Sequence, residues 1–593
     1  MRVPKAYVAM LMVVAAVTAG CSGSDAPPKP SAPPADHSTS TAAAQPFGDA
    51  GPGTGPFRRI WQADLPAAAA PPQDPYPSIE FVAGQVVVIS GRGLDVRDGR
   101  TGAARWHYYE RSRNLAGLAV TADTLVVTTV AVGANGAKLP DDKADLRTTG
   151  FDAVSGRVLW RADRFRPLHD GSLFRYKVVR TASGGVAVLR DEAEKKTLIA
   201  VDARTGRQRW TWTIPRGATC KPDPLDGDGS LLVLNANCEP DKDLYALDAA
   251  TGAVRWERPA HAGRLVGGSV QGGITMLTRR GPGSSLYRFS LIRADGKEIL
   301  GESARRVSAS GFAVAGDRAV VSHHDGDGVR NSRTRTWLGF VNTRTGKLER
   351  RVWERELVDL VAVGGRVYGL RSWLGEYAPA HFDLDPGLVP AALDAIDPGT
   401  SRVATVPLPF PKRGFWPNKN GHAVIDNVRI VGDRVYTARL LNTGLRLAAY
   451  ASADGASPVE LGGVRPDAWP DVCALLKGTS WARDPDNYPA DPLRLGSASI
   501  RRWSCKVDGG AEVRIGWVAA TAQEADELLD ASGTEARAIP NVGDEAYEIK
   551  INLQPSLVVR AGRYVVVFDD VPSMSDPFLL KAARTVAKGL ESR

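Results

Sequence analysis

A short recurring motif is the feature that most constrains what this chain can fold into. It reads Asp, two variable residues, Thr or Ser, Gly, three variable residues and Trp. The Asp and Thr or Ser side chains can bond turn backbone groups, and Gly accepts a positive φ, so each copy predicts a tight hairpin between two strands. Four complete copies occupy residues 98–106, 152–160, 202–210 and 248–256.

Weaker copies continue the series toward the carboxyl end. Turns around Gly296, Gly346, Gly399 and Gly455 extend the repeat, which recurs about every 50 residues. Strand-like runs precede the turns, so each unit is predicted to carry four strands. A unit of this size cannot bury both of its faces alone, whereas radial stacking of the units does. We therefore predict a mostly β fold, an eight-bladed β-propeller of four-stranded blades, with seven blades as the alternative, followed by a small α+β domain.

The repeat resembles the PQQ-like family of β-propellers, whose blades end in such a turn followed by a Trp. The resemblance covers roughly residues 57–460. It implies that the motif tryptophans pack between neighbouring blades and are structural. It also suggests that residues 59–62 supply a closing strand, since they resemble the strands after the turns. The structural tryptophans are Trp106, Trp160, Trp210 and Trp256.

The family name raises the question of a bound quinone. In the quinoprotein enzymes of this family, a vicinal disulfide, a Trp floor and a calcium ion mark the site, but this chain has no adjacent pair of cysteines. The acidic run 223–228 lacks a Glu where a bidentate calcium ligand is needed. The run 323–327, with two His and two Asp, is a candidate metal ligand set, or else an ordinary solvated loop. We predict no cofactor, no metal and no enzymatic activity.

The amino end carries an export signal. Arg2 and Lys5 precede the uncharged run 7–20, which is shorter than the roughly 20 residues that span a bilayer. The run ends in Val-Thr-Ala-Gly-Cys21, which resembles a bacterial lipobox. This resemblance implies a lipoprotein signal peptide over residues 1–20 and lipidation, such as palmitate, on Cys21. An ordinary signal peptide is the alternative. Residues 21–56, rich in Pro, Ala, Ser, Thr and Gly, are predicted to be a disordered tether.

Four cysteines remain once Cys21 is set aside, and four allow three disulfide pairings. Local pairing, Cys220 with Cys238 and Cys473 with Cys505, is the favoured one, and four free thiols are the alternative. Disulfides suit an exported protein. No pair has the CxxC spacing that zinc sites or thioredoxin chemistry require.

The repeat ends near residue 460, which divides the mature chain into a propeller, 57–463, and a second domain, 464–593. The second domain mixes helix and strand signals. It resembles the small DUF3558-like extracytoplasmic domains of actinobacterial lipoproteins through an early helical Cys473, a later Trp-Ser-Cys505 and the stretch 542–546. The resemblance implies no catalysis.

These features predict a lipoprotein anchored to the cell membrane through Cys21 and facing the outside. Its propeller is predicted to be a monomeric platform that binds a protein or envelope ligand. The net charge of +9 favours contact with anionic wall polymers or lipid head groups, and nucleic acid is an unlikely partner outside the cell. The alternatives are an exported enzyme acting on carbohydrate or cell-wall material in the propeller funnel, and an envelope sensor or assembly factor.

Overall fold

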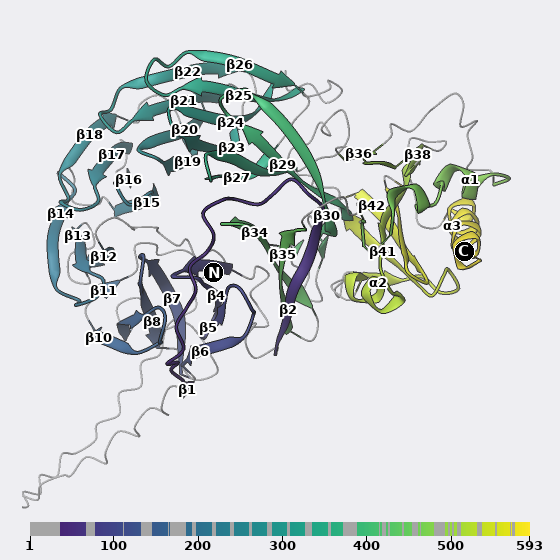
Figure 1. The fold of residues 1–593 in the computed structure, drawn as a ribbon, viewed down its shortest axis with the longest axis horizontal. Coiled ribbons are helices and arrows are strands. Elements are labelled where there is room, and N and C mark those ends of the chain that lie inside the picture. Colours follow the sequence, from purple (N-terminus) through teal and green to yellow (C-terminus); the bar gives the residue numbers. More distant parts are fainter. Residues whose placement is uncertain are drawn as a thin grey trace, which may run out of the picture. The chain divides into compact units, whose positions relative to one another are not determined.

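The computed structural model describes most of the chain after residue 35, as a sequence of sheets followed by a mixed α and β region (Figure 1). The first residues, 1–35, lie outside the described part, and so do Cys21, Cys220 and Cys238. The described residues are 36–592 except 67–77, 111, 132–144, 164, 167–184, 192–196, 216–220, 238–241, 260–263, 281–286, 305–308, 326–334, 354–356, 372–387, 414–415, 418–422, 425–426, 442–443, 454–459, 463, 480–492, 496–497, 501–502, 507–511, 530–535, 552–553, 570 and 572–575.

The predicted mostly β fold is confirmed. Strands of the described residues up to Ser452 form eight antiparallel sheets of four or five strands, which we number in chain order, and one two-stranded sheet. Each of the first four sheets consists of four successive strands, and the first gains β1 at its edge. Their bounds are β1 (Asp36–His37), β3 (Ser78–Val82), β4 (Gln85–Ser90), β5 (Gly93–Asp98), β6 (Ala104–Tyr109); β7 (Arg113–Val120), β8 (Thr124–Ala131), β9 (Leu146–Asp152), β10 (Val158–Ala162); β11 (Phe165–Arg166), β12 (Val186–Asp191), β13 (Thr197–Asp202), β14 (Gln208–Thr213); and β15 (Lys221–Gly227), β16 (Leu231–Asn237), β17 (Lys242–Asp248), β18 (Val254–Pro259).

Sheets five to seven repeat this order, and sheet eight differs in one strand. Its fourth strand is β2, taken from the amino end, which pairs along β35 from Phe57–Ser452 to Pro66–Gly444. Residues 59–62 thus lie in a closing strand, as predicted. The bounds are β19 (Arg264–Gln271), β20 (Ile274–Arg280), β21 (Tyr287–Arg293), β22 (Glu298–Ala304); β23 (Ala309–Ala315), β24 (Arg318–Asp325), β25 (Arg335–Asn342), β26 (Leu348–Trp353); β27 (Leu357–Val363), β28 (Arg366–Arg371), β29 (Leu388–Asp397), β30 (Arg402–Arg413); and β33 (Asn427–Val431), β34 (Arg434–Leu441), β35 (Gly444–Ser452), β2 (Phe57–Pro66), with a separate pair β31 (Trp416–Pro417) and β32 (Ala423–Val424).

Apolar clusters join every consecutive pair of sheets. One cluster holds Trp106 of sheet one together with Phe151 of sheet two, and the same kind of cluster recurs between each later pair. A further cluster joins Trp61 and Tyr436 of sheet eight to Val86 of sheet one. The order of packing is therefore cyclic, and the last sheet covers the open face of the first.

Burial along the strands explains their sequences. The second strand of sheet one, β4, is buried at every position and reads as a continuous apolar run, because other sheets cover both of its faces. An outermost strand such as β14 alternates instead, with Trp210 and Trp212 buried between exposed residues. The alternation leaves one face of the outermost strand for the neighbouring sheet and the other for solvent.

The segment 36–56, which we call the strap, differs from its prediction. Its composition predicted a disordered tether, but in the structure it lies against turns of several sheets (Figure 1). The Ser40 amide donates to Ser155 O, and the Phe47 ring lies over Gly99. The reason is long-range packing, since the turns it contacts lie up to several hundred residues away in the chain.

Residues after the eighth sheet form a separate layered unit with a six-stranded sheet in the order β38-β39-β43-β42-β41-β40. Helix α3 begins at Pro577, directly after the N-cap residue Asp576, whose carboxylate accepts a hydrogen bond from the Phe578 backbone N–H. No helix among the described residues is long and apolar enough to cross a membrane. The bounds are η4 (Pro466–Ala468), α1 (Val472–Leu476), β36 (Leu493–Leu495), β37 (Ala498–Ile500), β38 (Ser504–Lys506), β39 (Glu512–Val518), α2 (Ala522–Leu529), β40 (Arg537–Ala538), β41 (Glu545–Ile551), β42 (Gln554–Ala561), β43 (Tyr564–Asp569) and α3 (Pro577–Glu591).

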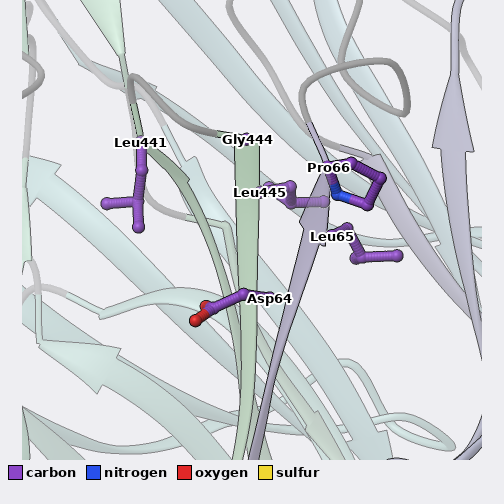
Figure 2. Close-up of a pocket in the computed structure, with 6 residues that line it drawn as sticks. All are labelled: Asp64, Leu65, Pro66, Leu441, Gly444 and Leu445. Carbon is purple, nitrogen blue, oxygen red and sulfur yellow. The ribbon is translucent and has the colours of Figure 1, made fainter.

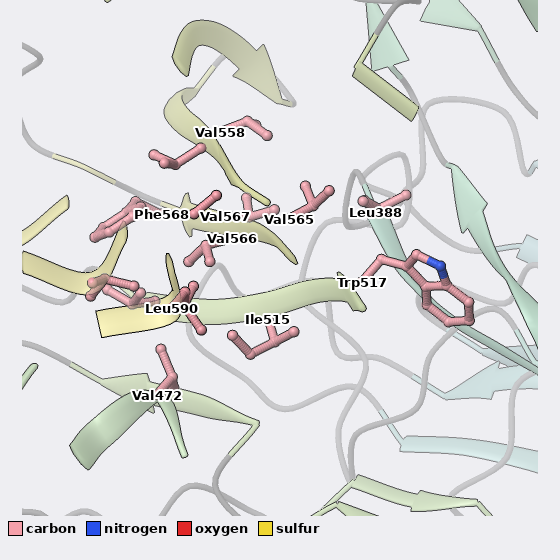
Figure 3. Packing of buried hydrophobic residues seen from close by; sticks show 14 of the residues in the cluster. Leu388, Val472, Ile515, Trp517, Val558, Val565, Val566, Val567, Phe568 and Leu590 are labelled. Atoms are coloured by element: carbon pink, nitrogen blue, oxygen red, sulfur yellow. The ribbon is translucent and has the colours of Figure 1, made fainter. Parts of the chain in front are cut away.

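The core of this carboxyl-terminal unit includes residues of sheet seven. Leu388 belongs to the same buried cluster as Trp517 and lies beside it in Figure 3. Arg514 of β39, almost fully buried, donates to Leu388 O and to the Asp569 carboxylate. The predicted disulfide between Cys473 of α1 and Cys505 of β38 is present. The carboxyl-terminal unit is thus joined to the ring of sheets by apolar contact and by a buried cation.

Candidate functional site

The recurring turns of sheets one to seven join the third and fourth strands of their sheets, and together we call them the turn rim. In the four complete copies, one oxygen of the Asp accepts both the backbone N–H and the hydroxyl of the Thr or Ser three residues later. For Asp202 these distances to Thr205 are 2.8 and 2.9 Å, and for Asp152 to Ser155 they are 2.9 and 2.8 Å. The motif residues therefore satisfy each other inside the turn, as their types predicted.

Electrostatics agrees with this geometry. Hydrogen bonds from Arg209 and from Thr205 hold the pKa of Asp202 below its usual value, against an opposing effect of burial. For Asp248, burial is the largest single effect and by itself would raise the pKa. Hydrogen bonds from Arg255 and Thr251 together outweigh burial, so the pKa of Asp248 is lowered. These carboxylates are ionised at neutral pH and are held by donors of the turn itself.

The tryptophans dock on the turn of the next sheet. Trp106 Nε1 donates to Ala153 O at 3.0 Å, and Trp160 Nε1 donates to Ala203 O at 2.7 Å. Trp210 repeats the contact with Ala249 O at 3.1 Å. Each of the first three sheets therefore holds the following one by a tryptophan ring and one hydrogen bond.

A fifth tryptophan, Trp61 of the closing strand β2, makes the same contact on sheet one. Its Nε1 donates to Gly99 O at 3.1 Å, and Tyr436 Oη of sheet eight donates to the same carbonyl at 3.0 Å. The sequence placed this residue in a closing strand without assigning its indole a role. The sequence did not predict this contact, because the Asp-to-Gly part of the motif does not precede Trp61.

The turn glycines are required by space as well as by conformation. Gly156 has a φ of +74°, and a Cβ there would lie 2.5 Å from the Trp106 ring. Gly206 and Gly252 stand in the same relation to Trp160 and Trp210. The Asp-x-x-Thr-Gly half of one motif and the Trp of the preceding motif thus form one contact.

The contact weakens where the motif degrades. Trp256 packs against Gly296 of sheet five, but its Nε1 has no hydrogen-bond partner among the described residues. The turn of sheet five is shorter, with the Arg293 amide donating to Lys297 O, so the carbonyl that accepts from the indole in earlier sheets is displaced. In sheet six Asn342 replaces the Asp and accepts the Thr345 amide at 3.0 Å.

Two acidic groups outside the motif also join sheets. Asp226 accepts the Val270 amide at 2.9 Å, and Asp228 accepts the Gly273 amide at 2.6 Å. Both carboxylates belong to the run that was compared with a calcium loop, and both are used to hold sheet five on sheet four. Among the described residues no group of three or more His, Cys, Asp or Glu side chains is placed to hold a metal ion.

A pocket of about 330 Å³ lies at the end of the closing hairpin (Figure 2). Arg446, next to it on β35, donates to Asp64 of β2 at 2.7 Å and also to Glu527 of α2. These two carboxylates raise the pKa of Arg446 despite its partial burial. The pocket is lined by Asp64, Leu65, Pro66, Leu441, Gly444 and Leu445.

One family model matches part of the repeat. Residues 144–368 match the PQQ_2 family, described as outer membrane protein assembly factor BamB. No curated protein matches the chain.

Several solved structures resemble this chain at low sequence identity. BamB from Moraxella catarrhalis is 12% identical, with a TM-score of 0.37, over 67% of this chain and 99% of that one. A quinohemoprotein alcohol dehydrogenase from Comamonas testosteroni is 12% identical, with a TM-score of 0.37, over 71% and 80%. The enzyme ADHIIG from Pseudomonas putida HK5 is 12% identical, with a TM-score of 0.36, over 74% and 83%.

Proposed function

We propose that this protein is an envelope lipoprotein, anchored through Cys21, whose eight sheets form an eight-bladed propeller that acts as a protein-binding scaffold. The observation that carries the proposal is the cyclic packing of the sheets through the turn rim, together with the match of residues 144–368 to the BamB-type repeat. A DUF3558-like domain, residues 464–593, completes the chain.

The internal chemistry of the repeat supports binding rather than turnover. The motif carboxylates accept hydrogen bonds from turn backbone groups, and the motif tryptophans form contacts between sheets. What the repeat leaves to solvent is the turns and connections at the sheet ends, which are the usual places for recognition. Fold alone does not establish function, so the proposal depends on a direct test.

The proposed location in the cell envelope is supported by the family match and by the amino-terminal sequence. The matched family is described as an assembly factor for outer membrane proteins, which supports a place in the cell envelope. The lipobox-like sequence before Cys21 supports attachment by lipid, and two or more acyl chains give stable anchoring. We further propose that the protein acts as a monomer facing the outside of the cell membrane.

Cross-linking capture from membranes tests the scaffold. The full chain and a C21A variant are expressed in the native host, cross-linked, purified and analysed for partner proteins and for the cross-linked residues. We expect a small, reproducible set of partners cross-linked to residues 57–463 in the native protein. Cross-links confined to residues 464–593, or turnover of sugars and esters without any partner, would contradict the scaffold proposal.

Mass spectrometry of the mature amino terminus tests the anchor separately. We expect a diacylated Cys21 as the first residue in the native protein and its loss in C21A. An unmodified terminus elsewhere would remove the anchor and leave the scaffold proposal standing.

A further inference from the structure

We propose that the turn rim of sheets two to six binds a soluble polyanion, a chain polymer that carries repeating phosphate groups. The proposal goes beyond protein binding and assigns a second kind of ligand to one side of the ring. It rests on a repeated cation in the turns and on the part of the rim that the strap leaves uncovered.

The residue directly after the turn glycine is a cation in four of these five sheets. It is exposed in every case and lies directly before the outermost strand. The turn geometry is the same in sheets two, three and six and one residue shorter in sheet five, so each charge lies at the entrance to the outermost strand of its sheet. The four residues are Arg157, Arg207, Lys297 and Lys347.

The carboxylates nearest in sequence are already engaged. Asp152 and Asp202 accept hydrogen bonds within their turns, and Asp295 pairs with Arg293 at 3.0 Å. In the described part of the chain, none of the four cations makes an ion pair with a carboxylate within 4.0 Å. Their charge is therefore presented to solvent.

Two further arginines of the rim are exposed but are balanced by carboxylates, so among the described residues of the rim the excess positive charge comes from the four unpaired cations. Arg204 is 51% exposed, although it bridges Asp123 and Asp152, and Arg344 is 78% exposed beside Asp317. A region in which cations exceed unengaged carboxylates attracts anions and concentrates them locally. The attraction acts only over about 10 Å at 0.1 M salt, so the ligand must lie on the rim itself.

The strap covers the remaining part of the same side. The first and third turns of each sheet lie at the same end, since the Gly99 amide donates to Gly84 O and the equivalent bond recurs in sheet three from Ala203 to Gly185 O. Strap backbone lies directly on Gly84, Gly432 and Gly364. These are the inner turns of sheets one, eight and seven.

The inner turns on the far side of the ring are open. A Cβ added at Gly185 of sheet three or at Gly316 of sheet six would meet nothing within 4 Å. The strap therefore covers the inner turns of sheets one, seven and eight, and its first residues reach the turn of sheet two, where His37 Nε2 lies 2.8 Å from Gly156 O and the Ser40 amide donates to Ser155 O. Arg157 lies beside the strap, and Arg207, Lys297 and Lys347 belong to sheets three, five and six.

One cation per sheet favours a polymer over a small anion. A single phosphate contacts one turn at a time, whereas a chain with many charges engages several turns at once, and the later contacts form at high effective concentration. Such binding weakens steeply as salt rises, because each contact releases counterions from the polymer.

The test uses the full chain carrying C21A, purified without lipid, so that it does not depend on the anchor. Binding is measured by fluorescence anisotropy to labelled polyphosphate of about 100 units, to tripolyphosphate, and by co-sedimentation with phosphatidylglycerol vesicles. The rim variant is R157Q/R207Q/K297Q/K347Q. A matched control, R465Q/K477Q/K581Q/K588Q, removes the same number of charges from exposed positions of the carboxyl-terminal unit.

We expect the native rim to bind long polyphosphate and to prefer it to tripolyphosphate and vesicles. The rim variant should lose roughly tenfold or more in affinity, and the control much less. Equal losses in the two variants, absence of binding at low salt, or rim-dependent binding of vesicles as strong as that of polyphosphate would overturn the proposal. Thermal unfolding of each variant separates lost binding from lost fold, and partner capture remains an independent readout of the scaffold.

Discussion

Substituting Gly156 by Ala places a methyl group at the contact between two neighbouring sheets. Gly156 has a φ of +74°, and its added Cβ would lie 2.5 Å from Cδ2 of Trp106, which is 2% exposed. A matched control exists at Gly316, where φ is +60° and the same methyl would meet nothing within 4 Å. The comparison separates the cost of the contact from the cost of the backbone conformation.

The expected magnitudes follow from these two environments. A non-glycine residue at positive φ costs about 1–2 kcal/mol, and this cost is common to G156A and G316A. Forcing an extra methyl group into a packed contact costs about 1–3 kcal/mol more, and only G156A incurs it. We therefore expect G156A to lower the free energy of unfolding by about 1–3 kcal/mol more than G316A does.

Urea unfolding followed by tryptophan fluorescence and by far-UV circular dichroism measures the difference. A ring of sheets need not unfold in one step, so the two signals are compared before a free energy is derived. The double variant W106A/G156A provides a second check, because removal of the ring should reduce the effect of G156A to that of G316A. If G156A is no less stable than G316A, the reasoning that the ring and the glycine form one contact is refuted.

Three further changes have expected outcomes. D202N should destabilise the protein at pH 6 by removing the carboxylate partner of Arg209. Because the pKa of Asp202 is lowered in the folded state, its stabilising contribution is complete above the unfolded value of 3.8 and is lost as pH falls from there through the lower folded-state pKa. The stabilities of the two proteins should therefore begin to converge below about pH 4 and continue to converge as the pH falls further. C473A/C505A should lower the stability of the carboxyl-terminal unit by about 3 kcal/mol, measured by urea unfolding and matched by reduction of the native protein. R446A should cost about 1–3 kcal/mol and speed amide exchange in α2, with little change in sheet three as the internal control.

Most of the ring could be predicted from local chemistry. The Asp, Thr and Gly of each turn act within a few residues, so their pattern is visible in the sequence and their hydrogen bonds are found in the structure. The closing role of residues 59–62 was visible for the same reason, since β2 repeats the form of the other outermost strands. The sequence located degraded copies such as the turn at Gly296, but it did not predict their hydrogen bonds. This turn is one residue shorter than the complete copies, and the sequence gives no clear signal of that difference.

The contacts of the candidate sites were not predictable in the same way. The Trp61 docking on Gly99, the Arg446 bridge between Asp64 and Glu527, and the buried Arg514 all join residues far apart in the chain. An exposed charge and a paired one look the same in a sequence. Only the fold shows which partners are within reach.

The sequence by itself determined the repeating unit, because a turn is built from the hydrogen-bonding capacity and backbone freedom of residues next to one another. Tertiary structure decided what happens to segments without such a pattern. The strap has the composition of a disordered chain, yet turn glycines of sheets one, seven and eight, brought together only by ring closure, give its backbone a surface to lie on. The order of those residues depends on neighbours that the linear sequence places hundreds of positions away, so no local property could reveal it.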